Sequence, residues 1–258
     1  MTTDRAAGDR LGGLAAWAPR TVPGPGVELA PAQELAIALR HLDDVGWCEN
    51  LTGHITYRVG DDLLVNPWGL WWAEVTAGDI LTIDADSAVI AGALDVTPAV
   101  HIHTELHRRR PDATVVVHNH PPYASALAAV AELPDLVHQN SSILADELVL
   151  VDDYDGEVDK PHLGSELAVR IGDASVALLV SHGVIVTAPT MAEAVYKSVQ
   201  FERTCMLHWL VRAMDGEPLP IAPTHQKQLK ASLVERAAPV YWNGVVRGLV
   251  AAEPEVLG

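Results

Sequence analysis

The chain has 258 residues, and its 17 lysines and arginines against 34 aspartates and glutamates give a formal net charge of −17. So acidic a surface repels phosphate backbones and anionic lipid, so we expect neither nucleic acid nor a membrane as a partner. Hydrophobic residues make up 49% and charged residues 20%, close to ordinary globular usage, which excludes disorder for most of the chain. The unusual feature is 12 histidines beside one phenylalanine, because histidine is both a near-neutral acid or base and a common metal ligand.

The cysteines and the apolar segments predict a cytoplasmic protein. Cys48 and Cys205 lie far apart without a CxxC pattern, so they predict neither a disulfide framework nor a thiolate zinc site. We expect both to be buried, reduced thiols. The N-terminus has no signal-peptide pattern, and no uninterrupted apolar stretch reaches the ~18 residues that a membrane helix needs.

In the first half of the chain, residues 1–30 are rich in Gly, Pro, Ala and Arg and predict a flexible N-terminal arm. Apolar residues at helical spacing predict a helix from Pro31, with Gly46 as its stop. Short strands bounded by Gly, Pro or Asp are predicted over 54–59, 62–66, 80–84 and 88–90. A helix over 98–109 then precedes Thr114–His118, an unbroken β-branched run typical of a strand buried on both faces.

The second half continues to alternate helices with strands. The predicted helices cover about 124–131, 164–171, 191–213 and 226–237. The predicted strands cover 148–151, 177–181 and 184–187, the last two flanking a tight turn at His182 and Gly183. Together these elements predict one α/β domain, a mixed sheet flanked by helices, over residues 31–258.

Two histidines, His118 and His120, stand at the end of the predicted buried strand. Side chains two apart on an extended chain point to the same side, so both imidazoles could reach one ion. His182 follows another apolar strand, again at a strand end, where open sheets place their ligands. Three neutral imidazoles leave coordination positions open, a pattern typical of a catalytic site for Zn, Mn, Fe or Co. The alternative for the first two is a pair of unrelated polar residues that cap a strand.

A second histidine cluster, His101, His103 and His107, lies on the helix predicted over 98–109. Glu105 sits about 200° around that helix from His103, so it cannot face the same ion as a histidine pair, which argues against a zincin-type site. We expect His101 and His107 on a solvated helix face, whereas His103 stays open as a catalytic candidate. Other histidines expected at the surface or in helix packing are His41, His162, His208 and His225.

Four motifs surround these histidines. They are Leu51-Thr-Gly-His-Ile-Thr-Tyr-Arg58, Val65-Asn-Pro-Trp-Gly69, Arg110-Pro-Asp-Ala-Thr-Val-Val-Val-His-Asn-His120 and Ser181-His-Gly183. Together they resemble the class II aldolase and adducin family from about residue 32 to residue 215. The resemblance implies a three-layer α/β/α domain with a central mixed, largely antiparallel sheet. It also implies a homo-oligomer, often a tetramer, with a divalent metal ion held by His118, His120 and His182.

The sequence departs from the sugar-phosphate aldolases of that family. Where those enzymes carry a Ser-Ser-Glu triplet, this chain has Thr97-Pro98-Ala99, so the catalytic carboxylate and one phosphate-binding hydroxyl are missing. Their Pro-Thr-Gly turn is Pro-Trp-Gly here, and Gln139 stands where a catalytic tyrosine is expected. These departures argue against a phosphorylated substrate and against retro-aldol chemistry.

Tryptophans occur where the phosphate site is lost. Trp68, Trp71 and Trp72 fall within five residues after a strand that should end near the cleft. A flat aromatic wall suits an aromatic ring, and we expect substrate contacts from Asn66, Trp68, Gly69 and Trp71. Packing in the core or in an oligomer interface is the alternative for these tryptophans. For Trp72 this alternative and the aromatic wall are equally well supported by the sequence.

The family has branches that act on aromatic rings, so the resemblance predicts a metal-dependent carbon-carbon lyase. The expected reaction is decarboxylation of a hydroxylated aromatic dicarboxylate, such as a dihydroxyphthalate or a hydroxypyridine dicarboxylate. Candidates for the group that returns a proton to carbon are His54, His103 and Tyr154. The alternatives are a non-haem iron oxygenase for hydroxylated aromatic acids, a sugar-phosphate aldolase or dehydratase, and a non-catalytic oligomeric module of the adducin kind.

Overall fold

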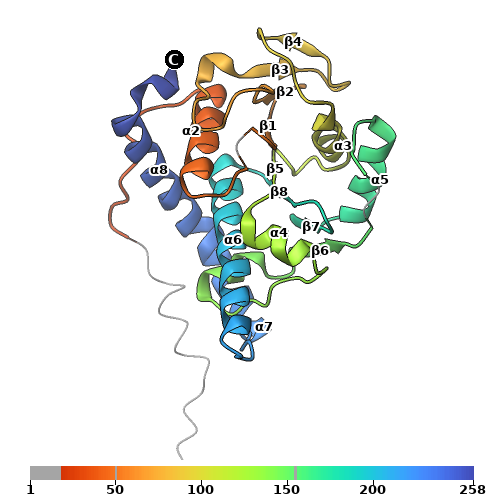
Figure 1. The fold of residues 1–258 in the computed structure, drawn as a ribbon. Helices are drawn as coiled ribbons and strands as arrows, with labels where there is room; N and C mark the ends of the chain where they lie inside the picture. Colours follow the sequence, from red (N-terminus) through yellow and green to blue (C-terminus); the bar gives the residue numbers. More distant parts are fainter. Residues whose placement is uncertain (1–18, 50, 154–155) are drawn as a thin grey trace, which may run out of the picture.

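A central sheet of eight strands organises the computed structural model, which describes residues 19–49, 51–153 and 156–258 (Figure 1). The strand order is β4-β3-β2-β1-β5-β8-β7-β6. The bounds are β1 His54–Val59, β2 Asp62–Val65, β3 Leu81–Ile83, β4 Val89–Ala91, β5 Val115–Asn119, β6 Leu148–Val151, β7 Val176–Leu179 and β8 Val184–Ala188. Within this sheet β6 and β7 pair in parallel and the other neighbours pair antiparallel, so the predicted mixed, largely antiparallel sheet is confirmed.

Helices cover both faces of the sheet and complete three layers. One layer contains α2 Pro31–Asp44, α4 Pro122–Ala128, α6 Met191–Ala213 and α8 Ala238–Ala252, with α7 Pro223–Ser232 at the end of α6. The other contains α3 His101–Arg109 and α5 Pro161–Ile171. Figure 1 shows α2, α6 and α8 on one side of the sheet and α3 with α5 on the other.

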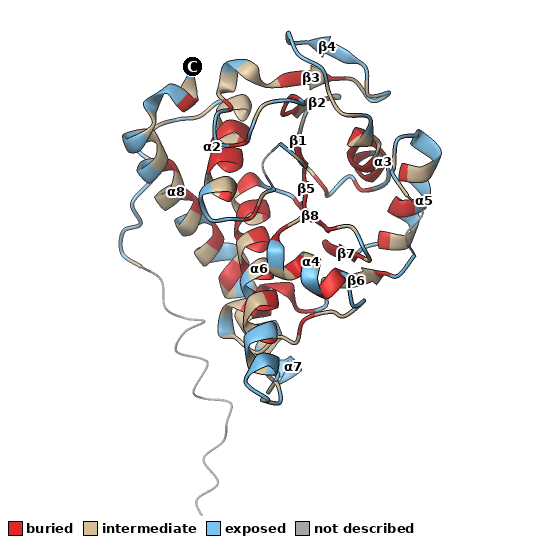
Figure 2. Ribbon diagram, in the orientation of Figure 1, coloured by how far each residue is buried: buried red, intermediate tan, exposed pale blue. Residues whose placement is uncertain are grey.

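Alternate residues of β5 face the two helical layers. Val115 and Val117 belong to the core shared with α2, α6 and α8, whereas Val116 belongs to the core shared with α3 and α5. Because side chains on a strand alternate between faces, His118 points to the same side as Val116. Figure 2 shows the buried residues along the central strands and on the helix faces that meet them. The metal-ligand candidate at the end of β5 therefore belongs to the α3 side of the sheet.

The helices differ from the sequence predictions mainly in their bounds. The helix predicted over 98–109 opens with a 3₁₀ turn, Pro98–Val100, in front of α3. The helix predicted near 226–237 is α7 followed by a π turn at Leu233–Ala237, and α8, which the sequence patterns did not predict, follows at once. Pro239 resembles a helix stop but lies in the first turn of α8, where a missing N–H costs nothing.

The described part of the predicted arm, residues 19–30, contains no helix or strand. It nevertheless contacts α8, because Nη1 of Arg247 donates to the carbonyl oxygen of Pro23 at 3.2 Å. Within the part of the chain that the structure describes, no helix is both long enough and apolar enough to cross a membrane.

Candidate active site

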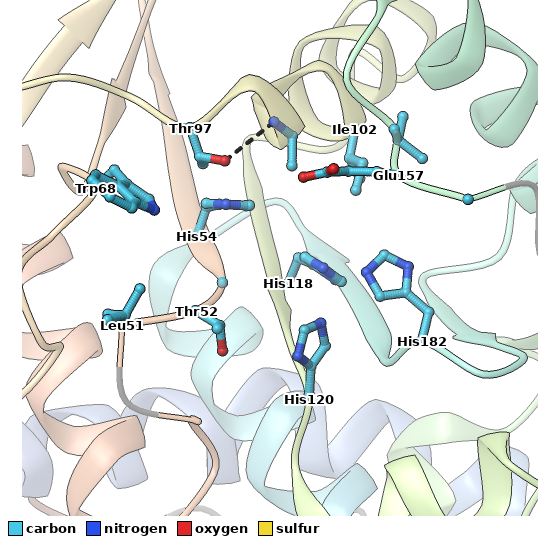
Figure 3. A pocket seen from close by; sticks show the side chains of 14 residues that line it. Leu51, Thr52, His54, Trp68, Thr97, Ile102, His118, His120, Glu157 and His182 are labelled. Atoms are coloured by element: carbon cyan, nitrogen blue, oxygen red, sulfur yellow. Dashed lines mark hydrogen bonds between the residues drawn. The ribbon is translucent and has the colours of Figure 1, made fainter.

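The three predicted metal ligands come from two segments of the chain. His118 lies on β5, His120 follows that strand, and His182 lies in the turn between β7 and β8 (Figure 3). Their candidate donor nitrogens all lie within 4.8 Å of one another. The ring centroids of His118 and His182 are 4.8 Å apart, those of His120 and His182 5.1 Å, and those of His118 and His120 5.3 Å. The arrangement is a compact triangle of imidazoles.

Hydrogen bonds on the outer ring nitrogens orient two of these imidazoles. Nδ1 of His118 lies 3.0 Å from the carbonyl oxygen of Val184, so it carries the proton and leaves Nε2 as a lone pair. Nδ1 of His120 lies 3.0 Å from Oε2 of Glu49, while its Nε2 is buried without a hydrogen-bond partner. A carboxylate or carbonyl behind a metal-binding histidine is the usual support for such ligands. The donor set and the orphaned nitrogen therefore fit a divalent metal ion.

Burial keeps two of these imidazoles, His118 and His182, unprotonated at neutral pH. Desolvation, followed by His182, His54, His120 and His103, lowers the pKa of His118 well below its ordinary value. Desolvation and then His120 lower the pKa of His182 to about 4. Since a metal ion binds the neutral form of histidine, protons compete weakly for these ligands near pH 7.

Asn119 ties the segment before β1 to the end of β5. Its Oδ1 accepts from the backbone N–H of Glu49 at 3.1 Å and its Nδ2 donates to the carbonyl oxygen of Thr52 at 2.8 Å. Gly53 makes the close approach possible, because it adopts φ +84° and a Cβ there would lie 2.4 Å from the carbonyl oxygen of His118. Neither Asn119 nor Glu49 was singled out from the sequence, since their roles depend on long-range pairing.

A cavity of about 350 Å³ opens beside the three histidines. Its described lining is Leu51, Thr52, Gly53, His54, Trp68, Thr97, Ala99, Ile102, His118, His120, Gly156, Glu157, Val158 and His182 (Figure 3). None of these lining residues is lysine or arginine. The cavity thus combines an imidazole cluster with walls of both apolar and polar residues and offers no cationic side chain of its own for a phosphate group.

Comparison with known proteins identifies the family of this chain. Residues 33–209 match the class II aldolase and adducin N-terminal domain family. The chain belongs to this family.

Named relatives within the family are diverse. An adducin-related protein of Schizosaccharomyces pombe is 32% identical over 67% of this chain, which spans 56% of that protein's length. A 4-hydroxy-3-prenylphenylpyruvate oxygenase/4-hydroxy-3-prenylbenzoate synthase of Streptomyces roseochromogenus subsp. oscitans is 32% identical over 72% of this chain and 69% of its own. A 3,4-dihydroxyphthalate decarboxylase of Arthrobacter keyseri is 29% identical over 78% of this chain and 84% of its own.

Solved structures of the family share the fold. An L-fuculose 1-phosphate aldolase from Glaciozyma antarctica PI12 superposes with a TM-score of 0.78 at 22% identity, covering 95% of this chain and 99% of that one. The match confirms the predicted fold class, a single α/β domain of the class II aldolase type.

The predicted substrate residues do not all reach the cavity. Trp68 lines it and is 59% exposed, whereas Asn66, Gly69 and Trp71 are not part of its lining. Asn66 is buried beneath it, where its Oδ1 accepts from the backbone N–H of Ile55 at 2.8 Å and so braces the strand that carries His54. Tyr154 lies outside the described residues.

Trp72 packs in the core rather than in the cavity. It is fully buried and stacks on Trp47, with ring centroids 6.5 Å apart and planes inclined by 22°. Of the two interpretations of this residue, core packing is the one that the structure bears out.

Family members of the sugar-phosphate type are expected to carry a glutamate where this chain has Ala99. In the structure Ala99 and Thr97 form cavity wall, and Oγ1 of Thr97 accepts from the backbone N–H of Ala99 at 3.3 Å. A carboxylate nevertheless lines the cavity, that of Glu157 from the loop that follows β6 (Figure 3). The sequence analysis did not single out Glu157, since no motif marks that loop position.

Two predicted acid-base candidates are buried imidazoles on the α3 side of the sheet. His54 lines the cavity, and desolvation, then His120 and His182, lower its pKa to about 3. His103 is fully buried behind the cavity lining, and desolvation, then His54 and His107, lower its pKa well below the ordinary value, opposed by the backbone of Val116. Both rings are therefore neutral at physiological pH.

The prediction of a solvated face for His101 and His107 is wrong for His107. That side chain is 5% exposed, because α3 turns the face shared by residues four apart, His103 and His107, toward β1. His101 is half-buried, with its Nδ1 3.2 Å from Oγ of Ser87. Desolvation and Arg58 lower the pKa of His107 to about 3, opposed by a hydrogen bond with the backbone of Ala113.

Proposed function

We propose that this protein is a divalent-metal-dependent lyase that decarboxylates a hydroxylated aromatic acid. The observation that carries the proposal is the cavity lining, in which three convergent histidines lie beside apolar surface and the described residues include no lysine or arginine for phosphate. A planar ring with a carboxylate next to a hydroxyl fits such a site, as in a dihydroxyphthalate or a hydroxypyridine dicarboxylate. The relative named 3,4-dihydroxyphthalate decarboxylase supports the same substrate class.

In this proposal the chain's own residues position the ring. Leu51, Trp68 and Ile102 supply apolar surface around the cavity, with Trp68 at an exposed position where its ring could stack on the substrate. His118, His120 and His182 would hold the metal ion. When bound, the ion supplies a Lewis acid that stabilises the negative charge developing as CO₂ leaves.

His54 is the residue that we assign to proton transfer. Its imidazole lines the cavity and is neutral at pH 7. Because burial makes it a weak base, it would accept the proton from a substrate hydroxyl made acidic by the metal ion that the three histidines would hold, as the carbon-carbon bond to the carboxylate breaks. The imidazolium then returns that proton to the ring carbon, where the electron pair of the broken bond remains. Hydroxy acid thus becomes phenolate and CO₂, with atoms and charge in balance.

The remaining acid-base candidates have weaker support. His103 is not among the cavity-lining residues, and Tyr154 lies outside the described residues. Glu157 does line the cavity, and its carboxylate could receive a proton from the substrate or from water.

The test combines metal analysis with turnover. Purified protein would be assayed for bound metal, then incubated with ortho-hydroxy aromatic acids and matched acids lacking the hydroxyl, with and without O₂. The expected result is a bound divalent metal and CO₂ release from hydroxylated acids that persists anaerobically.

Three outcomes would contradict the proposal. CO₂ release that requires and consumes O₂ would favour the iron oxygenase alternative; the Streptomyces relative is named an oxygenase. Cleavage of a sugar phosphate would favour the aldolase alternative. Absence of bound metal together with absence of turnover would favour a non-catalytic module.

Substitution of one ligand gives the first prediction. His182→Ala removes one of the three imidazoles, so bound metal and turnover should both fall to background. His162→Ala is the matched control, because that histidine is exposed on α5. Full activity in a metal-free His182→Ala protein would contradict the assignment.

We further propose that the protein assembles as a homo-oligomer, with a tetramer as the specific expectation. Exposed apolar side chains support an interface: Trp71 after β2, Trp209 on α6 and Met214 just beyond the end of α6. Light scattering coupled to gel filtration would test it, and a monomeric mass would contradict it.

A further inference from the structure

A row of four buried polar side chains runs from the interior to the cavity. Nδ1 of His107 lies 2.7 Å from the carbonyl oxygen of Ala113, and its Nε2 lies 2.7 Å from Oγ1 of Thr56. The same Oγ1 lies 2.9 Å from Nδ1 of His103. The ring of His103 meets that of His54 edge to face, with centroids 5.2 Å apart and planes inclined by 79°.

The direction of each hydrogen bond in this row is determined by its first member. A carbonyl oxygen only accepts, so Nδ1 of His107 carries a proton. The pKa of His107 is lowered to about 3, chiefly by burial, so the ring is neutral and its Nε2 can only accept, from the hydroxyl of Thr56. That hydroxyl has one proton, which leaves its oxygen to accept from Nδ1–H of His103.

The row ends at two orphaned atoms. With its proton on Nδ1, His103 has a bare lone pair on Nε2, and this atom is buried without a hydrogen-bond partner. Nδ1 of the neighbouring His54 is likewise buried without a partner. A buried polar atom left unpaired costs roughly 1–3 kcal/mol, so such atoms are rare. The structure records no hydrogen bond between these two atoms, but the two rings meet edge to face, so a proton on Nδ1 of His54 would complement the lone pair of His103 electrostatically.

We propose that His107, Thr56 and His103 form a polarised hydrogen-bond chain that fixes His54 in its Nδ1–H tautomer, so that its Nε2 presents a lone pair to the cavity. His107, Thr56 and His103 are then positioning residues for His54. The chain needs no carboxylate, because the carbonyl oxygen of Ala113 sets the direction of every bond that follows.

This polarity has a consequence for substrate choice, which rests on the proposed function. A cavity that presents an acceptor nitrogen favours a ligand with a hydroxyl group at that point. With a ligand that lacks the hydroxyl, the nitrogen stays without a hydrogen-bond partner. Losing one such hydrogen bond costs about tenfold in affinity. His54 would therefore select for the ring hydroxyl as well as receive its proton.

The tautomers can be measured directly. In protein containing ¹⁵N-labelled histidine, long-range proton–nitrogen correlation spectra distinguish Nδ1–H from Nε2–H rings, and spectra of His54→Gln, His103→Gln and His107→Gln proteins assign the signals. Metal-free and zinc-loaded samples should both show the Nδ1–H form for all three histidines. An Nε2–H signal for His54 in the wild-type protein would overturn the proposal, without need of any variant.

Thr56 tests whether the hydrogen bonds between His107, Thr56 and His103 act together on His54. Thr56→Val keeps the side-chain shape but removes the hydroxyl, so the His54 signal should become a mixture of tautomers and the preference for hydroxylated over deoxy acids should fall about tenfold. Thr56→Ser restores the hydroxyl and should restore both. Thr82→Val, on β3 and outside the row, is the matched control and should change neither.

The two readouts separate this inference from the proposed function. If no aromatic acid is turned over but the Nδ1–H tautomers are found and depend on Thr56, the chain stands and the substrate assignment falls. If decarboxylation is found but His54 keeps one tautomer in the Thr56→Val protein, the chain is overturned and the lyase assignment stands.

Discussion

Glu49 lies 71 residues before His120 in the chain, and its carboxylate supports the His120 ring from behind. Its Oε2 lies 3.0 Å from Nδ1 of His120, and the glutamate side chain is 61% exposed. So open a pair adds little to folding stability. Its effect is on orientation, since it holds the ring with Nε2 toward the other two histidines.

At the residue scale, Glu49→Gln should therefore weaken metal binding by about 10-fold or more, with little change in thermal stability. The amide keeps the side-chain shape but cannot offer the same charged acceptor to Nδ1–H. Competition titration with a zinc chelator would measure the affinity. Glu166→Gln, at an exposed position on α5, is the control, and equal affinities for the two variants would contradict an orienting role for Glu49.

At the element scale, the approach of β1 to β5 depends on Gly53. His54 pairs directly with His118 across these antiparallel strands, and Gly53 precedes that pair with φ +84°. A Cβ at this position would lie 2.4 Å from the carbonyl oxygen of His118 and 2.5 Å from Nδ2 of Asn119. The two strand ends could not then keep their present separation.

Gly53→Ala and Gly60→Ala separate crowding from backbone strain. Both glycines have positive φ, but nothing lies within 4 Å of a Cβ at Gly60, so both variants carry the left-handed penalty of ~1–2 kcal/mol. The Gly53 variant alone should lose metal affinity as well, because β5 and its ligands must shift. Calorimetry with metal titration would measure both quantities, and equal metal affinity in the two proteins would contradict the crowding argument.

The elements themselves were largely predictable, and the exceptions have physical reasons. The β-branched run of β5 and the His182-Gly183 turn predicted where the ligands lie, because period and turn chemistry are local properties. The burial of His107 was missed although His103, a catalytic candidate, lies one turn away on the same helical face. Helix α8 was missed because Pro239 resembles a stop in sequence and is tolerated only by its first-turn position.

The residues that complete the cavity were not predictable from motifs. Glu157 and Asn119 gain their roles from loop geometry and strand pairing, which no local pattern encodes. Conversely, Trp71 sits in a suggestive cluster but is exposed outside the described cavity lining. The sequence thus predicted the fold and the convergence of His118, His120 and His182, whereas the other residues around the cavity required the structure.

At the scale of the whole molecule, five imidazoles with lowered pKa values make stability depend on pH. The pKa falls to about 3 for His54 and His107 and to about 4 for His182, and it lies well below the ordinary value for His103 and His118. Each ring binds a proton more readily in the unfolded chain, whose pKa is about 6.5. Their contribution is therefore complete above about pH 6.5 and is lost as the pH falls toward 3 to 4.

We expect the metal-free protein to lose unfolding free energy steeply between about pH 6.5 and pH 4, by up to ~1.4 kcal/mol per pH unit for each such group. Urea unfolding at several pH values in this range would measure the slope. His107→Gln should reduce the slope of unfolding free energy against pH by the contribution of about one titrating group. His162→Gln, at an exposed position, should leave the slope unchanged. A stability independent of pH over this window would contradict the buried, neutral state of the cluster.

The central pairs β1–β5 and β5–β8 join segments that are distant along the chain, and the ligand candidates sit at the ends of those pairs. Pairings of that kind form late during folding, because a long loop must close before they gain any contact. The histidine triangle therefore has no precursor in a half-assembled sheet. We expect refolding chains to acquire zinc only after most secondary structure has returned. The rate of metal uptake would therefore report the rate at which the central strands pair.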